Sequence, residues 1–240
     1  MNKLDLLYEG KAKQIYQTDD SDILWVQYKD SATAFNNIKK AKIAGKGRLN
    51  NEISSLLFTL LQAKGIRNHF IKKISPTEQL VQKVTIIPIE VVVRNVATGS
   101  LVNRLGVGEG TIIAQPIVEF YLKDDALGDP LINDDHIAML ALATPEQLTE
   151  LRQMSLAINH ILLQHFTGLN VKLIDFKLEF GIRPNGEVIL ADEISPDTCR
   201  LWDALTDEKL DKDIFRQDLG DLVTAYQEIL QRLGGKTSDV

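Results

Sequence analysis

The segment at positions 173–181, Leu-Ile-Asp-Phe-Lys-Leu-Glu-Phe-Gly, constrains the fold of this chain more than any other. Its apolar side chains fall at every second position, as they do in a β-strand whose side chains alternate between two faces. The apolar face holds Ile174, Phe176, Leu178 and Phe180. The opposite face carries Asp175, Lys177 and Glu179, although Asp is depleted from ordinary strands. Such a face is either a salt-bridge ladder or a functional cluster, and the strand alone leaves both open.

A hairpin signal follows this strand directly. Asn185-Gly186 separates it from a second apolar run at 188–191, and Asn-Gly is a favoured pair in tight hairpin turns. The returning run ends at Asp192, which the hairpin brings back beside Lys177 and Glu179. Mg²⁺ suits this arrangement, because it usually takes one or two carboxylates and completes its shell with phosphate oxygens and waters. The pattern therefore predicts a metal–phosphate site.

Composition limits the class of protein. With 240 residues, 44% hydrophobic and 25% charged, the chain is expected to be globular, as one large domain or two small lobes. A net charge of −6 argues against nucleic-acid binding, although a local basic pocket for phosphates remains compatible with it. The single cysteine, Cys199, excludes an internal disulfide and fits a reducing compartment. No apolar run approaches a membrane span and no signal-peptide core is present, so we expect a cytoplasmic protein without a membrane partner.

Local patterns predict a β-rich first part. Strands are expected at 6–8, 13–16, 23–29, 69–74 and 79–84, with an amphipathic helix at 48–64 that stops at Gly65. Pro88 then interrupts the chain ahead of an apolar strand, so 85–88 is predicted as a hinge. The lobes would be 1–84, which is β-rich, and 85–240, which contains the predicted metal–phosphate site.

The second part is expected to mix helices with strands. Thr144-Pro145-Glu146-Gln147 combines an N-cap, a first-turn proline and a Gln three residues after the cap, and so predicts a helix from there to about His165. A closing helix is expected at 221–233. Strands in both lobes without a repeating βαβ pattern predict an α+β fold.

Three further constellations suggest chemistry. The first is Gly10-Lys11-Ala12-Lys13, which could lie over phosphates as glycine-rich loops do in kinase-type sites, or could be an ordinary surface turn. It does not match the P-loop pattern. Arg94 ends an apolar strand shortly before Gly99 and Ser100, which favours a phosphate cradle or, alternatively, an arginine paired with a structural acid. Asp129 lies in an Asp-rich turn that could be a solvated loop. The histidines have no ligand spacing, so zinc is not expected.

Two of these segments resemble the signature segments of the SAICAR synthetase family, the phosphoribosylaminoimidazole-succinocarboxamide synthases of purine biosynthesis. They are residues 86–94 running into Thr98-Gly99-Ser100, and residues 173–181. Further similar segments lie at 8–13, 50–52, 104–106, 192–203 and 212–216. The likeness covers nearly the whole chain in the right order, which makes it specific.

The resemblance implies an ATP-dependent ligase. Such an enzyme joins the carboxylate of CAIR, a phosphorylated aminoimidazole ribonucleotide, to the amine of L-aspartate and gives SAICAR, ADP and phosphate. It also implies a two-lobed fold similar to that of kinases with ATP in the interlobe cleft, Mg²⁺ as a cofactor, and a homodimer. No nucleic-acid or membrane partner is implied.

The resemblance also assigns site residues. The nucleotide-binding set is Gly10, Lys11, Ala12, Lys13, Val84 and Glu90, with 84–88 as the adenine-side hinge. The Mg²⁺ ligands are Glu179 and Asp192, and the catalytic residues are Asp175 and Lys177. The substrate set is Arg94, Ser100 and Arg200 around the CAIR phosphate, with Asp129 and Asp197 as further contacts.

The binding site for aspartate and the closing lid are less defined. Lys46, Arg216 and the loop at Asp30 are candidates for aspartate, and 30–36 with 39–47 is the candidate lid. Asn36-Asn37 departs from the residue-Gly pair common in related sequences. Two rival classes remain, a small-molecule kinase and a non-catalytic nucleotide-binding module, and the complete set of one lysine with two carboxylates argues against the second.

Overall fold

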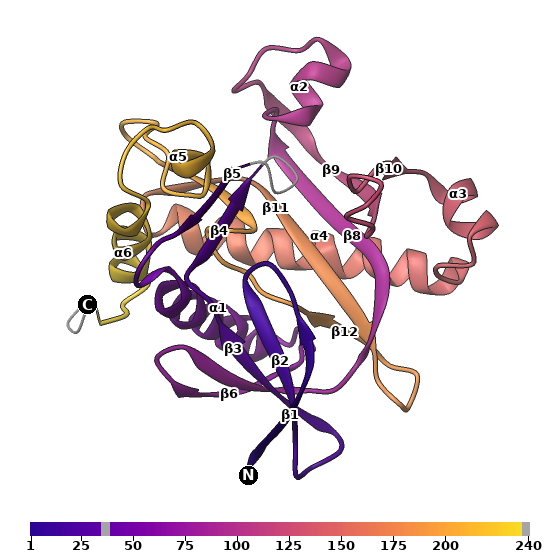
Figure 1. Ribbon diagram of the computed structural model, residues 1–240. Helices are drawn as coiled ribbons and strands as arrows, with labels where there is room; N and C mark the ends of the chain where they lie inside the picture. Colours follow the sequence, from indigo (N-terminus) through magenta and orange to yellow (C-terminus); the bar gives the residue numbers. More distant parts are fainter. Residues whose placement is uncertain (35–38, 237–240) are drawn as a thin grey trace.

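The computed structural model describes residues 1–34 and 39–236 and contains two main antiparallel sheets (Figure 1). The first sheet has the strand order β1-β2-β3-β7-β6. Its strands are β1 (Lys3–Glu9), β2 (Lys13–Thr18), β3 (Ile23–Tyr28), β6 (Phe70–Ser75) and β7 (Glu78–Gln82). Helix α1 (Lys46–Ala63) packs against β3, β6 and β7.

The second sheet carries most of the candidate site. Its order is β10-β9-β8-β11-β12, and β13 also pairs with β11. The strands are β8 (Thr85–Val96), β9 (Ile112–Leu122), β10 (Leu131–Ile132), β11 (Val171–Ile182), β12 (Val188–Ala191) and β13 (Cys199–Asp203). The long helix α4 (Pro145–Thr167) contacts β8, β9 and β11 and crosses behind them in Figure 1. All strand pairs in this sheet are antiparallel, which confirms the predicted α+β class.

The remaining elements are short. They are the hairpin of β4 (Ser31–Ala34) and β5 (Lys39–Lys42), and the helices α2 (Ser100–Leu105), α3 (Asp134–Met139), α5 (Asp213–Arg216) and α6 (Leu222–Arg232). Helix α6 packs against α1, and α5 contacts β4. The predicted lid coincides in part with the β4–β5 hairpin, and the Asn36-Asn37 pair lies outside the described residues.

Several local predictions are confirmed. The side chain of Thr144 accepts from the N–H of Gln147 while the side chain of Gln147 accepts from the N–H of Thr144, which is the expected capping box. The β11–β12 hairpin turns at Gly186 with φ 87°. The apolar face of β11 is at most 1% exposed, because α4 and the core cover it.

The predicted hinge at 85–88 is wrong. These residues open β8 and pair with β11, Thr85 opposite Ile182 and Ile86 opposite Gly181. Pro88 fits because the register shifts beside it, so the ladder has no need of an N–H at that position. Residues 83–84 form the connection along the chain between β7 and β8.

One hydrophobic core extends under both sheets. It joins α1 residues such as Phe58 to β8, β11, α4 and α6, represented by Val91, Phe176, Phe166 and Tyr226, all at most 1% exposed. From the first sheet, Phe70 on β6 joins this core, while Val26, Tyr28 and Val81 form a small separate cluster. The two main sheets are therefore separate, but α1, which packs on the first, shares its core with the second.

Candidate functional site

The charged face of β11 lies beside a charged face of β8. Arg94 pairs with Asp175 and Glu90 pairs with Glu179 in the antiparallel ladder, with Lys177 between them on β11. Since side chains alternate along each strand, these residues project from the sheet face opposite to the apolar positions. Asp175 and Glu179 are each 4% exposed, so this face is polar and yet buried.

Lys177 is the centre of a lysine–carboxylate cluster. Its Nζ lies 2.8 Å from Glu90 Oε1, contacts Glu179 Oε1, and is 3.9 Å from Asp192 Oδ2. Lys123 reaches the same Glu179 oxygen at 2.8 Å. Burial alone would lower the pKa of Lys177, but the carboxylates of Glu179, Asp192 and Glu90 outweigh it and raise that pKa well above the usual value. The lysine therefore remains cationic.

Lys13, from the predicted phosphate loop, meets the same cluster from the first sheet. Its Nζ contacts Asp192 Oδ1 and lies 3.0 Å from Glu193 Oε1. Burial would raise the pKa of Asp192, but Lys13 and Lys177 hold it well below its usual value. The prediction that the hairpin returns Asp192 beside Lys177 is confirmed at 3.9 Å. The two sheets therefore meet through ion pairs at this point.

The rest of the phosphate loop forms a tight turn between β1 and β2. The N–H of Gly10 donates to the carbonyl of Lys13 at 2.8 Å, and the carbonyl of Ala12 accepts from the N–H of Lys29 at 2.7 Å. Lys11 extends to Asp125 in the β9–β10 loop, with 2.6 Å between Nζ and Oδ1. The loop therefore contacts both the lysine–carboxylate cluster and an outer loop of the second sheet.

Val84 lies in the link between the sheets. A Cβ built on Gly181 would lie 2.3 Å from Val84 Cγ2, which is far too close. Gly181 at the end of the 173–181 segment thus makes room for the link to cross β11.

Arg94 is held on all sides by acceptors. Its Nε donates to Glu119 at 2.6 Å and its Nη1 to Asp175 at 2.8 Å. Its Nη2 donates to Ser100 Oγ and to the hydroxyl of Tyr121, both at 3.2 Å. The side chain of Arg94 is 4% exposed. Arg94 is therefore paired with buried acids, as one of the two interpretations expected, and it also contacts Ser100.

Arg200 is more open than Arg94. Its Nη1 donates to Asp175 and its Nε to Asp213, both at 2.8 Å, while within the described residues its Nη2 donates to no acceptor. A Cβ at Gly99 would lie 2.9 Å from this Nη2, and Gly99 has φ 54°. Asp175 Oδ2 also accepts from Thr98 Oγ1 at 3.1 Å. The buried carboxylate of Asp175 thus orients both arginines. Among the described residues, the Nη2 of Arg200 remains available for a ligand beside Gly99.

Asp197 is the centre of a separate cluster. Its Oδ2 accepts from the fully buried Lys46, its Oδ1 accepts from Tyr226 Oη at 2.6 Å, and Lys212 Nζ lies 3.6 Å away. Burial would raise the pKa of Asp197, but the two lysines hold it well below its usual value. The β4–β5 hairpin leads into α1 at Lys46, so this cluster joins the candidate lid to α6.

Asp129 lies in the loop before β10 with φ 48°, and its Oδ1 accepts from the N–H of Asp124 at 3.0 Å. Within the described residues, no hydrogen bond or ion pair joins Asp129 to Arg94 or Arg200. The predicted site residues of β8 and β11 are therefore joined by direct contacts, whereas Asp129 makes no direct contact with either arginine in the described part of the chain.

Sequence reasoning missed several members of these clusters. Glu119 on β9 and Asp213 on α5 hold the two arginines, and Glu193 shares Lys13 with Asp192. Lys123, which contacts Glu179, was not predicted as a site residue either. It directly follows β9, where its N–H donates to the carbonyl of Pro88 at 3.1 Å, and β9 itself was not predicted.

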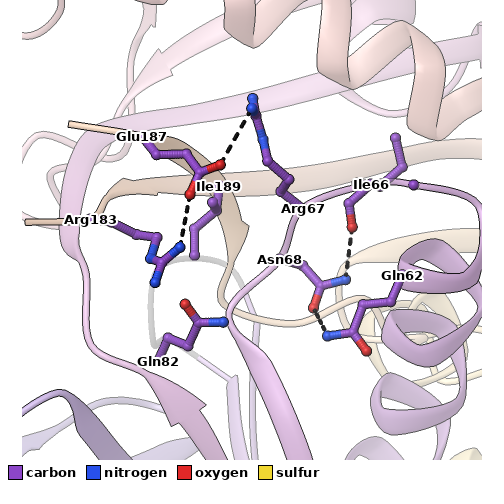
Figure 2. Close-up of a pocket in the computed structure, with 9 residues that line it drawn as sticks. Gln62, Ile66, Arg67, Asn68, Gln82, Arg183, Glu187 and Ile189 are labelled. Carbon is purple, nitrogen blue, oxygen red and sulfur yellow. Dashed lines mark hydrogen bonds and ion pairs between the residues drawn. The ribbon is translucent and has the colours of Figure 1, made fainter. Parts of the chain in front are cut away.

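A cavity of about 310 Å³ lies away from these clusters (Figure 2). Its walls come from the end of α1, the end of β7 and the β11–β12 hairpin. Arg67 and Arg183 both pair with Glu187 across it, as Figure 2 shows. Gln82 Oε1 is buried there and has no hydrogen-bond partner among residues 1–34 and 39–236. None of the predicted site residues lines this cavity.

The carboxylates fit a metal that shares its shell with a substrate. In the described part of the chain, no group of three or more His, Cys, Asp or Glu side chains could hold a metal ion by itself. Glu179 and Asp192 provide carboxylate oxygens from two adjacent strands, which suits Mg²⁺ with phosphate oxygens as further ligands. No helix of residues 1–34 and 39–236 is long and apolar enough to cross a membrane.

The fold and the site together define a class: an α+β protein that gathers lysines, arginines and carboxylates on one sheet face, as an enzyme acting on phosphorylated substrates requires. The chain belongs to the SAICAR synthetase family, whose model matches residues 6–233.

Known proteins resemble the chain over nearly its full length. It is 65% identical over 235 residues to the phosphoribosylaminoimidazole-succinocarboxamide synthase of Bacillus cereus strain B4264, covering 98% of each chain. The solved structure of the enzyme of that name from Ehrlichia chaffeensis is 46% identical with a TM-score of 0.95, over 98% of this chain and 100% of that one. A structure described as SAICAR synthetase (Type-2) in complex with ADP is 47% identical with a TM-score of 0.94, over 97% and 99%.

Proposed function

We propose that the chain joins the carboxylate of CAIR to the amine of L-aspartate at the expense of ATP, giving SAICAR, ADP and phosphate. As a member of this family it is an ATP-dependent ligase of purine biosynthesis. One observation carries the residue assignments: on β11, the acid that orients two arginines lies two residues from the lysine of the carboxylate cluster. A site for a substrate phosphate then adjoins a site for nucleotide phosphates.

The arginine pair would bind the phosphate of CAIR. The Nη2 of Arg200, which has no acceptor among the described residues, lies beside Gly99. Together with the Oγ of Ser100 and a remaining N–H of Arg94, it offers donors suited to phosphate oxygens. Asp175 would keep both guanidinium groups in place from the buried side. Asp129 and Asp197 remain proposed as further substrate contacts.

The nucleotide would bind at the meeting point of the two sheets. A relative at 47% identity is described as a complex with ADP. The phosphate loop, Gly10 to Lys13, would cover the phosphates, with Val84 and Glu90 nearer the rest of the nucleotide. Glu179 and Asp192 would hold Mg²⁺, which neutralises charge on phosphate oxygens when bound.

The reaction needs an activated carboxylate, because a carboxylate repels nucleophiles and lacks a leaving group. Transfer of the γ-phosphoryl group of ATP to a carboxylate oxygen of CAIR releases ADP and makes an acyl phosphate. The amine of aspartate then attacks the acyl carbon, the C–N bond forms, phosphate leaves and the amine loses a proton. Lys177, kept cationic by its neighbours, would stabilise the negative charge that develops during phosphoryl transfer.

Further features of the protein follow as proposals. The lobes would divide at residues 84 and 85, where the first sheet has ended and the second begins. The chain would act in the cytoplasm on small molecules, and would form a homodimer. Exposed apolar side chains on the edge strand β1, such as Leu7 at 47% and Tyr8 at 62%, offer a surface that a second copy could cover. Light scattering after gel filtration tests the dimer.

One assay tests the activity. Protein, MgATP and CAIR are mixed, and ADP is measured with and without L-aspartate. Steady-state ADP formation should require CAIR and aspartate together. Rapid turnover with CAIR alone, giving a stable phosphorylated product, would instead show a small-molecule kinase.

A further inference from the structure

Two neighbouring carboxylates reach the same cation. Asp192 and Glu193 are adjacent in sequence, yet both contact the ammonium group of Lys13. In an extended strand adjacent side chains point to opposite faces, so the backbone has to turn between them. It turns at Asp192, whose φ of 58° lies in the left-handed region that residues other than glycine rarely adopt. A contact that holds this turn would also determine where both carboxylates point.

His69 makes such a contact. Its ring Nε2 lies 3.1 Å from the carbonyl oxygen of Asp192. A carbonyl oxygen can only accept, so Nε2 carries the hydrogen and donates it. The ring is fixed, because it is 6% exposed and packs edge-on against Phe58 with 5.3 Å between ring centroids.

The backbone of His69 is anchored on both sides. Its N–H donates to the carbonyl of Leu190 on β12 at 2.9 Å, and its carbonyl accepts from the N–H of Gln82 at the end of β7 at 2.7 Å. His69 is thus tied to the strand that leads into Asp192 and to the first sheet. Both the position and the orientation of the donor are determined by the fold.

We propose that His69 is a positioning residue for the carboxylates of Asp192 and Glu193, because its Nε2–H···O=C bond holds the left-handed turn that directs both toward Lys13. The inference rests on the proposed role of Asp192 as a Mg²⁺ ligand and extends that site to a residue from the segment before β6. His69 acts through the main chain of Asp192 and not through contact with a substrate.

Two substitutions separate the donor from the packing. His69→Phe keeps a ring of similar shape against Phe58 and removes the donor, whereas His69→Gln places an amide N–H near the position of Nε2. His160→Phe makes the same chemical change at an exposed position on α4 and is the control. The measurements are the affinity for ADP by calorimetry, with and without Mg²⁺, and the melting temperature of each variant.

The wild-type protein should bind ADP more tightly with Mg²⁺. His69→Phe should lose roughly 10-fold of this enhancement, as expected when the partner of a metal ligand is removed. His69→Gln and His160→Phe should keep the enhancement within about twofold. If His69→Phe does not fold, His69→Met takes its place under the same criterion.

Other results overturn the inference in distinguishable ways. If wild-type binding of ADP does not respond to Mg²⁺, the proposed role of Asp192 fails and the inference fails with it. If the wild type responds and His69→Phe keeps the full enhancement at a lower melting temperature, His69 contributes only packing. If His69→Gln loses as much as His69→Phe, the hydrogen bond is not what positions the carboxylates.

Discussion

The two arginines that share Asp175 should respond differently to replacement by lysine. In the described ranges, Arg94 makes four hydrogen bonds, to Glu119, Asp175, Ser100 and Tyr121. An arginine has five N–H groups, so one remains for a ligand, and a lysine with three cannot replace the set. Arg200 uses one Nε and one Nη1 hydrogen within the described residues, which leaves its Nη2 for a ligand. Arg94→Lys should therefore cost mainly stability, and Arg200→Lys mainly affinity.

The magnitudes follow from these contacts. Arg200→Lys removes a forked donor to phosphate, and one charge-assisted hydrogen bond contributes about 1.5–3 kcal/mol. At 1.4 kcal/mol per tenfold, CAIR should bind roughly 10- to 150-fold more weakly, while ATP affinity changes little. Arg94→Lys leaves buried acceptors under-satisfied at about 1–3 kcal/mol, and a chain of this size loses roughly 2–4 °C of melting temperature per kcal/mol.

Calorimetry with CAIR and with ATP, beside thermal melting, tests both variants. Arg200→Met is a useful companion, because it keeps the length of the side chain and removes its charge. Equal weakening of both ligands in Arg200→Lys would contradict the assignment. So would a melting temperature in Arg94→Lys that matches the wild type, since the pairing of Arg94 would then contribute nothing to the fold.

Three further predictions follow. Glu179→Gln and Asp192→Asn should each keep the fold, weaken Mg²⁺-dependent ADP binding and lower turnover. Normal activity with unchanged Mg²⁺ dependence in both variants would show that the cluster is only a structural ion-pair network. Gly99→Ala should weaken CAIR binding, because the new Cβ would lie 2.9 Å from Arg200 Nη2 at a φ of 54°, and calorimetry showing wild-type affinity would refute this. Burial, and secondly Asp213, raise the pKa of the Asp211 carboxyl to about 7. The protonated carboxyl therefore favours the folded state at low pH, and this contribution to the free energy of unfolding is lost as pH rises from about 4 to 7. Urea unfolding should therefore show Asp211→Asn losing less stability than the wild type over that range, and a constant difference at every pH would be the contrary result.

The sequence predicted the parts of the site that depend on local pattern. The alternation in 173–181 and the Asn185-Gly186 turn were enough to place Asp192 beside Lys177, because a hairpin fixes its own register. The capping box at Thr144 was equally local. The hinge at 85–88 was predicted from Pro88 alone, and it was wrong because a register shift in the sheet accommodates the proline.

The remaining contacts depend on tertiary arrangement. Arg200 contacts Asp175 only because β13 pairs with the N-terminal half of β11. Glu119 contacts Arg94 only because β9 pairs with β8. No spacing within the chain encodes either pairing. The same holds for His69, whose ring meets a carbonyl 123 residues away.

The shared core has a consequence for how the chain unfolds. Because α1 buries Phe58 and its neighbours in the same apolar cluster as β8, β11 and α6, the first sheet cannot separate without exposing the core of the second. Unfolding should therefore be one cooperative transition, with calorimetric and van't Hoff enthalpies that agree. A fragment cut at the link between the sheets would present that apolar surface to water, so neither half is expected to survive as a stable, independent domain.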